Sequence, residues 1–175
     1  MKKLLIIVFA MLIGSFAFAE RPPMYAGGVI GLDTYGYGGE SITAFGMEPV
    51  FGIRPLPLKN MGFELGLHIS FPATHDYGGY SLKTSYWGMS TKYFYDFKAF
   101  SALPKMNAVV YGGLGFISAK EKGKYSSGTA FEFTMPLGGG LKYQFLEHLE
   151  GVFKTELIIC DYWGFNILTG VNYTF

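Results

Sequence analysis

The chain has 175 residues, of which 50% are apolar and 18% aromatic, while only 15% are Asp, Glu, Lys or Arg. This composition excludes intrinsic disorder, which needs few aromatic residues and much charge. The 14 basic and 13 acidic residues give no electrostatic footprint for nucleic acid, and the one cysteine has no partner for a disulfide. So little charge suggests a protein whose solvent is partly lipid, yet no stretch after residue 20 has the ~20 apolar residues of a membrane-spanning helix.

Residues 1–19 are typical of a cleaved secretory signal peptide. Two lysines open it, residues 4–13 are apolar, and Ala17 and Ala19 are the small residues that a cleavage site needs. An uncleaved anchor helix is the alternative, but Gly14 and Ser15 interrupt the apolar stretch before it could span a bilayer. Cleavage predicts a mature chain of residues 20–175, a single domain of 156 residues (175 − 19 = 156).

In the mature chain the apolar residues recur with a period of two, which predicts strands with two different faces. The pattern is cleanest in residues 61–71 and 129–145. Six further segments alternate less cleanly, namely 24–34, 42–53, 82–96, 107–117, 150–160 and 165–175. Turns rich in Gly and Pro are predicted between them, among others at 35–39, 54–57, 75–79 and 125–128. Eight strands of ~11 residues, the length that a tilted strand needs to cross a bilayer, fit within this chain.

Alternation alone leaves the outer face undecided, because a soluble ligand-binding barrel also alternates, with its apolar residues inward. Two features favour apolar faces that meet lipid. The polar faces consist mainly of small residues, which suit a crowded lumen, whereas a water-exposed surface would carry more Lys and Glu. Aromatic residues also gather near strand ends, as they do at membrane interfaces. These residues are Tyr93, Tyr95, Phe97, Tyr143, Phe145, Tyr162, Trp163 and Phe165.

The last predicted strand ends in phenylalanine and carries apolar side chains at alternate positions, namely Phe165, Ile167, Val171, Tyr173 and Phe175. This pattern resembles the C-terminal signal of bacterial outer-membrane barrels, which the barrel-assembly machinery recognises. The whole mature chain resembles the small eight-stranded outer-membrane proteins, the OmpX, opacity-protein and OmpA-barrel group. The resemblance implies an all-β fold, an eight-stranded antiparallel up-and-down transmembrane β-barrel. It also implies a monomer in contact with outer-membrane lipid and lipopolysaccharide, although the long outer loops usual in the group are not evident here.

With the apolar faces toward lipid, the opposite faces place seven titratable residues in the lumen. These are Glu64, His68, Lys92, Glu132, Lys142, Lys154 and Glu156. They need partners there, because desolvating a lone charge costs several kcal/mol. An ion path or an active site is one interpretation of this set. We predict instead an internal ladder of ion pairs, because an eight-stranded barrel is just wide enough for its own side chains. The expected role is therefore structural or surface-interactive, and the barrel is not an open pore.

A lipid-modifying hydrolase is the alternative function. His68, Ser70 and Glu64 share one face of one predicted strand and are the residue types of a nucleophilic triad. Outer-membrane lipid A deacylases resemble this barrel and use a His-x-Ser pair with a Glu, but their pair lies in a later strand and is followed by Asn, where this chain has Phe71. We therefore predict hydrogen bonds within the lumen and no enzymatic activity.

Two smaller clusters complete the candidate sites. Lys120, Lys122 and Lys124 lie in a segment predicted as a loop between the fifth and sixth strands. Lipopolysaccharide phosphates would attract such a loop if it is extracellular, and a solvated loop tip is the alternative. His75 and Asp76 supply half of a metal site without further ligands, so we predict no metal and no cofactor.

Overall fold

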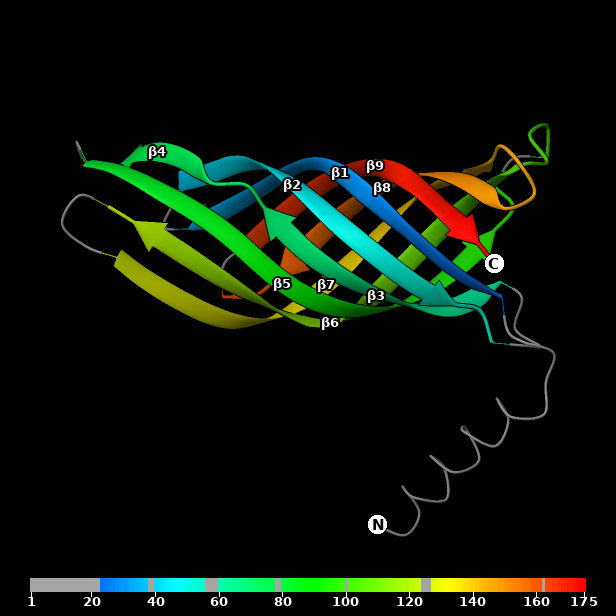
Figure 1. Ribbon diagram of the computed structural model, residues 1–175, viewed down its shortest axis with the longest axis horizontal. Helices are drawn as coiled ribbons and strands as arrows, with labels where there is room; N and C mark the ends of the chain where they lie inside the picture. The colour runs from blue at the N-terminus through cyan, green and yellow to red at the C-terminus, as the bar shows by residue number, and fades with distance from the viewer. Residues whose placement is uncertain are drawn as a thin grey trace, which may run out of the picture.

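The computed structural model describes residues 23–37, 40–55, 60–77, 80–99, 101–123, 127–161 and 163–175. The predicted signal peptide at 1–19, Lys124 and Tyr162 lie outside the described residues. The strands are β1 (Met24–Tyr37), β2 (Glu40–Ile53), β3 (Met61–Ser70), β4 (Ala73–Tyr77), β5 (Tyr80–Phe97), β6 (Met106–Lys122), β7 (Ser127–Gln144), β8 (Leu149–Ile159) and β9 (Trp163–Thr174) (Figure 1). In the part of the chain that is described, no helix is long and apolar enough to cross a membrane.

The strands close into an antiparallel barrel. Their order is β3-β2-β1-β9-β8-β7-β6-β5-β4, and a further pairing of β3 with β5 completes the ring. The first and last strands pair along most of their length, from Tyr25 opposite Thr174 to Gly36 opposite Trp163. A closed ring leaves no edge whose backbone groups would lack partners in hydrocarbon. The predicted all-β, eight-stranded up-and-down barrel is thus confirmed.

The structure has nine labelled strands around an eight-stranded ring because β4 continues the path of β3. Residues 61–71 were expected as one strand, but β3 ends at Ser70 and β4 begins at Ala73. Pro72 lies between them and has no N–H to donate to a strand ladder, which accounts for the break. The chain then resumes pairing with β5, from Ala73 opposite Thr84 to Tyr77 opposite Tyr80. The turn predicted at 75–79 was therefore wrong for residues 75–77.

Three strands are much longer than the ~11 residues that a membrane crossing requires. β5, β6 and β7 have 18, 17 and 18 residues, and Figure 1 shows the β4–β5 and β6–β7 hairpins projecting beyond the other strands, away from the C-terminus. Lys120 and Lys122 belong to β6, opposite Thr129 and Ser127 of β7, so placing them in a loop was wrong. The alternation Lys-Glu-Lys is itself a period of two, which suits a strand with both faces outside the bilayer.

The apolar faces point outward along the barrel wall. On β3 the outward side chains Leu65 and Leu67 are 45% and 42% exposed, whereas Glu64 on the opposite face is 4% exposed. Buried apolar side chains form separate clusters toward the two ends of the lumen. One cluster contains Tyr25 and Phe94, and another contains Tyr35 and Tyr86. The interior between them is mainly charged, the reverse of a soluble protein, with one small apolar cluster of Val29, Val152 and Leu168.

Outward aromatic side chains form two bands. Near the chain termini, the Phe63 and Tyr93 ring centroids lie 5.2 Å apart. Toward the other end, Phe45 and Phe71 are 5.9 Å apart. Phe63 and Phe71 are eight residues apart in sequence, ~26 Å at 3.3 Å per residue. A strand tilt of ~40° reduces this to about 20 Å. That distance is close to the ~25 Å apolar band of outer-membrane barrels.

Candidate functional site

The middle of the lumen is crossed by a charge cluster centred on Lys92. Its Nζ lies 2.7 Å from a carboxylate oxygen of Glu48 and 2.6 Å from one of Glu156. The three side chains come from β5, β2 and β8 and are each at most 3% exposed. Because one ammonium forms ion pairs with two carboxylates from other strands, the cluster connects different walls of the barrel.

A second buried pair lies beside this cluster. Lys154 donates to Glu64, and the hydroxyl of Tyr25 donates to the other oxygen of that carboxylate over 2.7 Å. The Tyr111 ring serves both lysines, with its centroid 5.5 Å from the Nζ of Lys92 and 5.7 Å from that of Lys154. An aromatic face stabilises a cation that is withdrawn from water. The buried lysines of the lumen are therefore stabilised both by carboxylates and by an aromatic ring.

Further pairs continue toward the terminal end of the barrel. Asp96 accepts from Lys142 and from Arg54, each over 2.8 Å. The Nζ of Lys142 also lies 4.3 Å from the centroid of Phe94. Arg54 follows β2 and is half-buried. Arg54, Asp96 and Lys142 therefore fill the lumen at the end of the barrel where β1 begins and β9 ends.

At the other end, His68 joins the charge cluster to the tyrosine layer. Its Nε2 lies 3.1 Å from Asp33 and 3.2 Å from the hydroxyl of Tyr35, while its Nδ1 lies 3.9 Å from Glu48. Tyr35 in turn stacks on Tyr86, with ring centroids 4.2 Å apart. Polar contacts thus extend through most of the barrel's length.

Glycines on the lumen side of the strands make room for the large side chains of the network. A Cβ at position 66 would collide with the carboxylate of Glu48, and one at position 52 would collide with the ring of Tyr25. Both glycines face the lumen from strands adjacent to the residue that they accommodate. The small residues of the polar faces therefore make room for large ones on neighbouring strands.

The structure brings together six of the seven residues predicted for the lumen. Glu64, His68, Lys92, Lys142, Lys154 and Glu156 are buried and have charged partners. Glu132 is the correction: it faces inward from β7 but is half-exposed and forms none of these pairs, because the part of β7 before Met135 has no partner in β8.

Sequence reasoning missed several members of the network, namely Tyr25, Asp33, Glu48, Arg54 and Asp96. Asp33 and Glu48 lie within predicted strands, so counting alternate positions from Gly31 and Gly46 would have placed both in the lumen. Arg54 follows a strand, and no alternation pattern locates it.

The triad expected for the alternative function does not assemble. His68 contacts Asp33, Tyr35 and Glu48, Glu64 is taken by Lys154 and Tyr25, and the buried Ser70 hydroxyl makes no hydrogen bond among the described residues. His75 and Asp76 gain no further ligands, since the described residues contain no group of three or more His, Cys, Asp or Glu that could hold a metal ion.

The side chains expected to form the assembly signal lie on the outward face of β9 and at Phe175, which follows that strand. Phe165 and Ile167 are 39% and 41% exposed, and Val171, Tyr173 and Phe175 are 51–57% exposed. They are therefore displayed along one lipid-facing row, next to β1 on one side and β8 on the other.

Comparison with solved structures places this fold among known proteins. Neisserial surface protein A (NspA) matches with a TM-score of 0.71 over 87% of this chain and 97% of that chain, at 11% sequence identity. The fold is that of the small eight-stranded outer-membrane barrels. Ail, the attachment invasion locus protein of Yersinia pestis, matches with a TM-score of 0.65, at 11% identity, over 89% of this chain and all of that chain.

A major outer membrane protein from Thermus thermophilus is similar as well, with a TM-score of 0.64 and 14% identity over 89% of this chain and all of that chain. No known family model matches the sequence, and no curated protein matches it. At these identities the likeness lies in the barrel itself and extends to no individual functional residue.

Proposed function

We propose that this chain is an integral protein of a bacterial outer membrane that acts at its surface, without transport through the lumen and without catalysis. The observation that carries the proposal is the Lys92 cluster, which joins β2, β5 and β8 across the middle of the barrel. The void beside Glu48, His68 and Glu156 is about 20 Å³, room for about one water molecule. A barrel so filled offers solutes no path.

The outward face supports the membrane location. An unbroken apolar surface is unfavourable in water, and soluble monomers rarely expose apolar patches of more than a few hundred Å². Here every long strand contributes exposed apolar side chains to the outward face, including Ile30, Phe51, Leu137 and Ile167. Bacterial outer membranes are where closed barrels of this kind reside, and the residue 1–19 segment supplies the export signal that this location requires.

The assembly signal on β9 provides the test of location. Expressed in a Gram-negative host, the wild-type chain should fractionate with the outer membrane and migrate differently in SDS gels before and after boiling. Phe175→Asp should reduce the outer-membrane form about tenfold while secretion past the inner membrane continues, because it places a charge on the displayed lipid-facing row. Leu146 is exposed in the connection between β7 and β8, outside that row, so Leu146→Asp serves as the matched control.

Two results would contradict the proposal. One is recovery of the wild-type chain outside the outer-membrane fraction, whereas normal assembly of the Phe175→Asp variant would contradict only the role of the C-terminal residue in assembly. The other is stepwise ion conductance by the purified wild-type barrel in planar bilayers, which would mean that the lumen is open.

A surface role is supported by a lysine face on the β5–β6 hairpin, consisting of Lys83, Lys120 and Lys122. Lys83 lies directly opposite Lys122 in the strand register, and all three side chains are exposed. Like charges directly opposite are destabilising, and a bound anion would relieve the repulsion. The outward Trp87 and Phe116 rings, 5.6 Å apart, follow along the same strands, so the lysines lie where phosphates border the apolar layer.

We expect this face to bind the phosphates of lipopolysaccharide. Each lysine near an anionic membrane surface contributes about 1 kcal/mol. Changing all three to Gln should therefore weaken binding of fluorescent lipopolysaccharide to the barrel about 100-fold. The effect should shrink at high salt, because exposed charges are screened. A variant with Lys98→Gln and Lys105→Gln, both exposed at the opposite end, should bind normally; equal losses in both variants would argue against a specific face.

One relative in fold provides a precedent for anion binding. Ail was solved in complex with the heparin analogue sucrose octasulfate, and that structure matches with a TM-score of 0.63 at 11% identity. At this identity, no binding residue of Ail can be assigned to a position of this chain. The likeness supports only the idea that a barrel of this size can present a polyanion site.

A further inference from the structure

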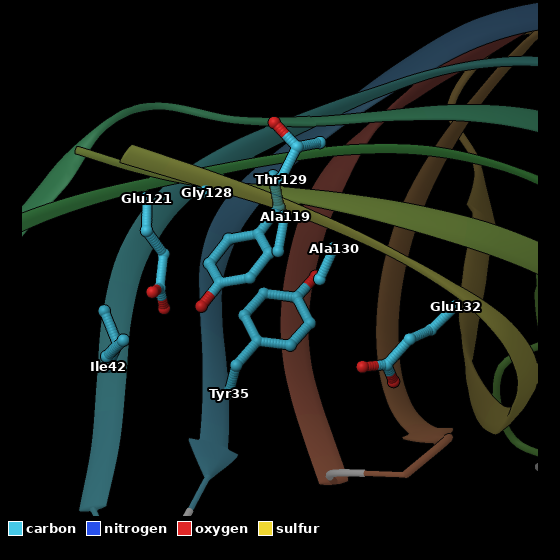
Figure 2. Close-up of a pocket in the computed structure, with 9 residues that line it drawn as sticks. Tyr35, Ile42, Ala119, Glu121, Gly128, Thr129, Ala130 and Glu132 are labelled. Carbon is cyan, nitrogen blue, oxygen red and sulfur yellow. The ribbon is translucent and has the colours of Figure 1, made fainter. Parts of the chain in front are cut away.

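A pocket of about 330 Å³ opens at the end of the barrel away from the chain termini. Figure 2 shows it between the end of β1 and the β6–β7 hairpin. The stacked rings of Tyr35 and Tyr86 lie within it, inclined by 28° to each other. Ile42 and Ala119 add apolar surface. Pockets of this size, mostly apolar with a few polar groups, are typical of small-molecule sites.

The charged side chains of the pocket are all acidic among its described lining residues. Glu121 and Glu132 line it, and no described lining residue is Lys or Arg. One oxygen of Glu132 is shielded from solvent and has no hydrogen-bond partner among the described residues. The carboxyl as a whole is hydrogen-bonded by the Asp161 backbone and the Cys160 side chain, and the Asp161 carboxylate adds a second negative charge beside it. Because Lys120 and Lys122 alternate with Glu121, the strand turns the lysines outward and the glutamate inward. The pocket is therefore suited to a cation that donates hydrogen bonds.

The arrangement of the carboxylates indicates the shape of that cation. Figure 2 shows Glu121 and Glu132 on opposite sides of the Tyr35 ring. Glu121 is opposite Gly128 in the register, and Glu132 lies four residues further along β7, a separation of ~13 Å along the strand. The described residues contain no group of three or more His, Cys, Asp or Glu that could hold a metal ion, so the two carboxylates do not form a metal site. They suit a ligand with a positive charge at each end.

We propose that this pocket binds a linear aliphatic polyamine. Each terminal ammonium would donate to one carboxylate in a charge-assisted hydrogen bond. The methylene chain would lie across the tyrosine rings, whose faces attract the neighbouring positive charge. This binding site is separate from the lysine face, which lies on the outer side of β5 and β6.

Calorimetric titration of spermidine into the folded barrel, in an uncharged detergent at low salt, tests the proposal. Saturable binding at one site per barrel is expected. Glu121→Gln and Glu132→Gln should each raise the Kd about tenfold, since each removes a charge-assisted hydrogen bond. Tyr86→Leu should weaken spermidine binding as well, although it changes no charge. Glu147→Gln, which neutralises an exposed glutamate at the opposite end, should leave the Kd unchanged.

Four outcomes would overturn the proposal, three of them in the titrations of the wild-type barrel and its variants. These three are an absence of saturable binding to the wild-type barrel, unaltered binding when both pocket glutamates are replaced, and an equal loss in the Glu147→Gln control. Displacement of spermidine by Mg²⁺ at equal ionic strength would also overturn it, because it would indicate charge screening without recognition of the chain. Heat-modifiable migration in SDS gels confirms beforehand that each variant is folded.

Discussion

Lys92→Met should lower the free energy of unfolding by about 3–5 kcal/mol, the usual cost of removing one partner from a buried ion pair. The loss of stability is large because Lys92 forms ion pairs with two buried carboxylates. Without it, Glu48 and Glu156 would remain buried at 1% and 3% exposure, and no other lysine is within ion-pair distance of either among the described residues. Urea titration of the barrel folded into lipid vesicles, followed by tryptophan fluorescence, measures the effect.

A rescue variant separates charge from packing in this experiment. Lys92→Met combined with Glu48→Gln and Glu156→Gln removes the unpaired charges but keeps the side-chain volumes, so it should recover much of the loss. Lys98→Met, at an exposed position just after β5, should change stability by no more than about 0.5 kcal/mol, as surface substitutions usually do. A Lys92→Met barrel as stable as the wild type would mean that the cluster does not hold the lumen closed.

The sequence predicts which side chains enter the lumen but not which of them pair. A period of two assigns Glu64 and Lys92 to the inner face, and the register makes their Cα atoms direct neighbours. Their ion pairs nevertheless go elsewhere: Glu64 pairs with Lys154, and Lys92 with Glu48 and Glu156. These partners lie across the lumen, and their relative height depends on the stagger of the closed barrel. That stagger is a property of the whole ring, which no single strand encodes.

The projecting hairpins were missed for a related reason. Alternation is informative where one face meets lipid and the other the lumen, but both faces of a strand beyond the bilayer are polar. Residues 118–122 and 127–130 are mostly small or charged and match a loop as well as a strand. Their pairing extends a register already set within the membrane, from Gly115 opposite Thr134 to Lys122 opposite Ser127. The pocket between this hairpin and the barrel was therefore beyond prediction from sequence.

The second large effect is expected from a charge placed on the outward, lipid-facing side of the barrel wall. Leu67→Arg should destabilise the barrel by ~2–4 kcal/mol, the cost of an arginine on the lipid face at the bilayer midplane. Leu67 lies on β3 midway between Phe63 and Phe71, the residues that mark the two aromatic bands, and is 42% exposed. Leu103→Arg is the matched control, because Leu103 is 46% exposed but lies in the connection between β5 and β6, outside the apolar band.

The two variants distinguish lipid from water as the outer solvent. In water, both leucines are surface residues of similar exposure, and their replacement by Arg should cost equally little. In a bilayer, only Leu67 is surrounded by hydrocarbon, so only Leu67→Arg should lower the unfolding free energy measured in vesicles. A lipid-soluble photoreactive probe should correspondingly label residues 61–71 and 129–145. Equal stability of the two arginine variants, with those segments unlabelled, would mean that the apolar wall does not face lipid, because a leucine surrounded by acyl chains cannot accept an arginine without cost.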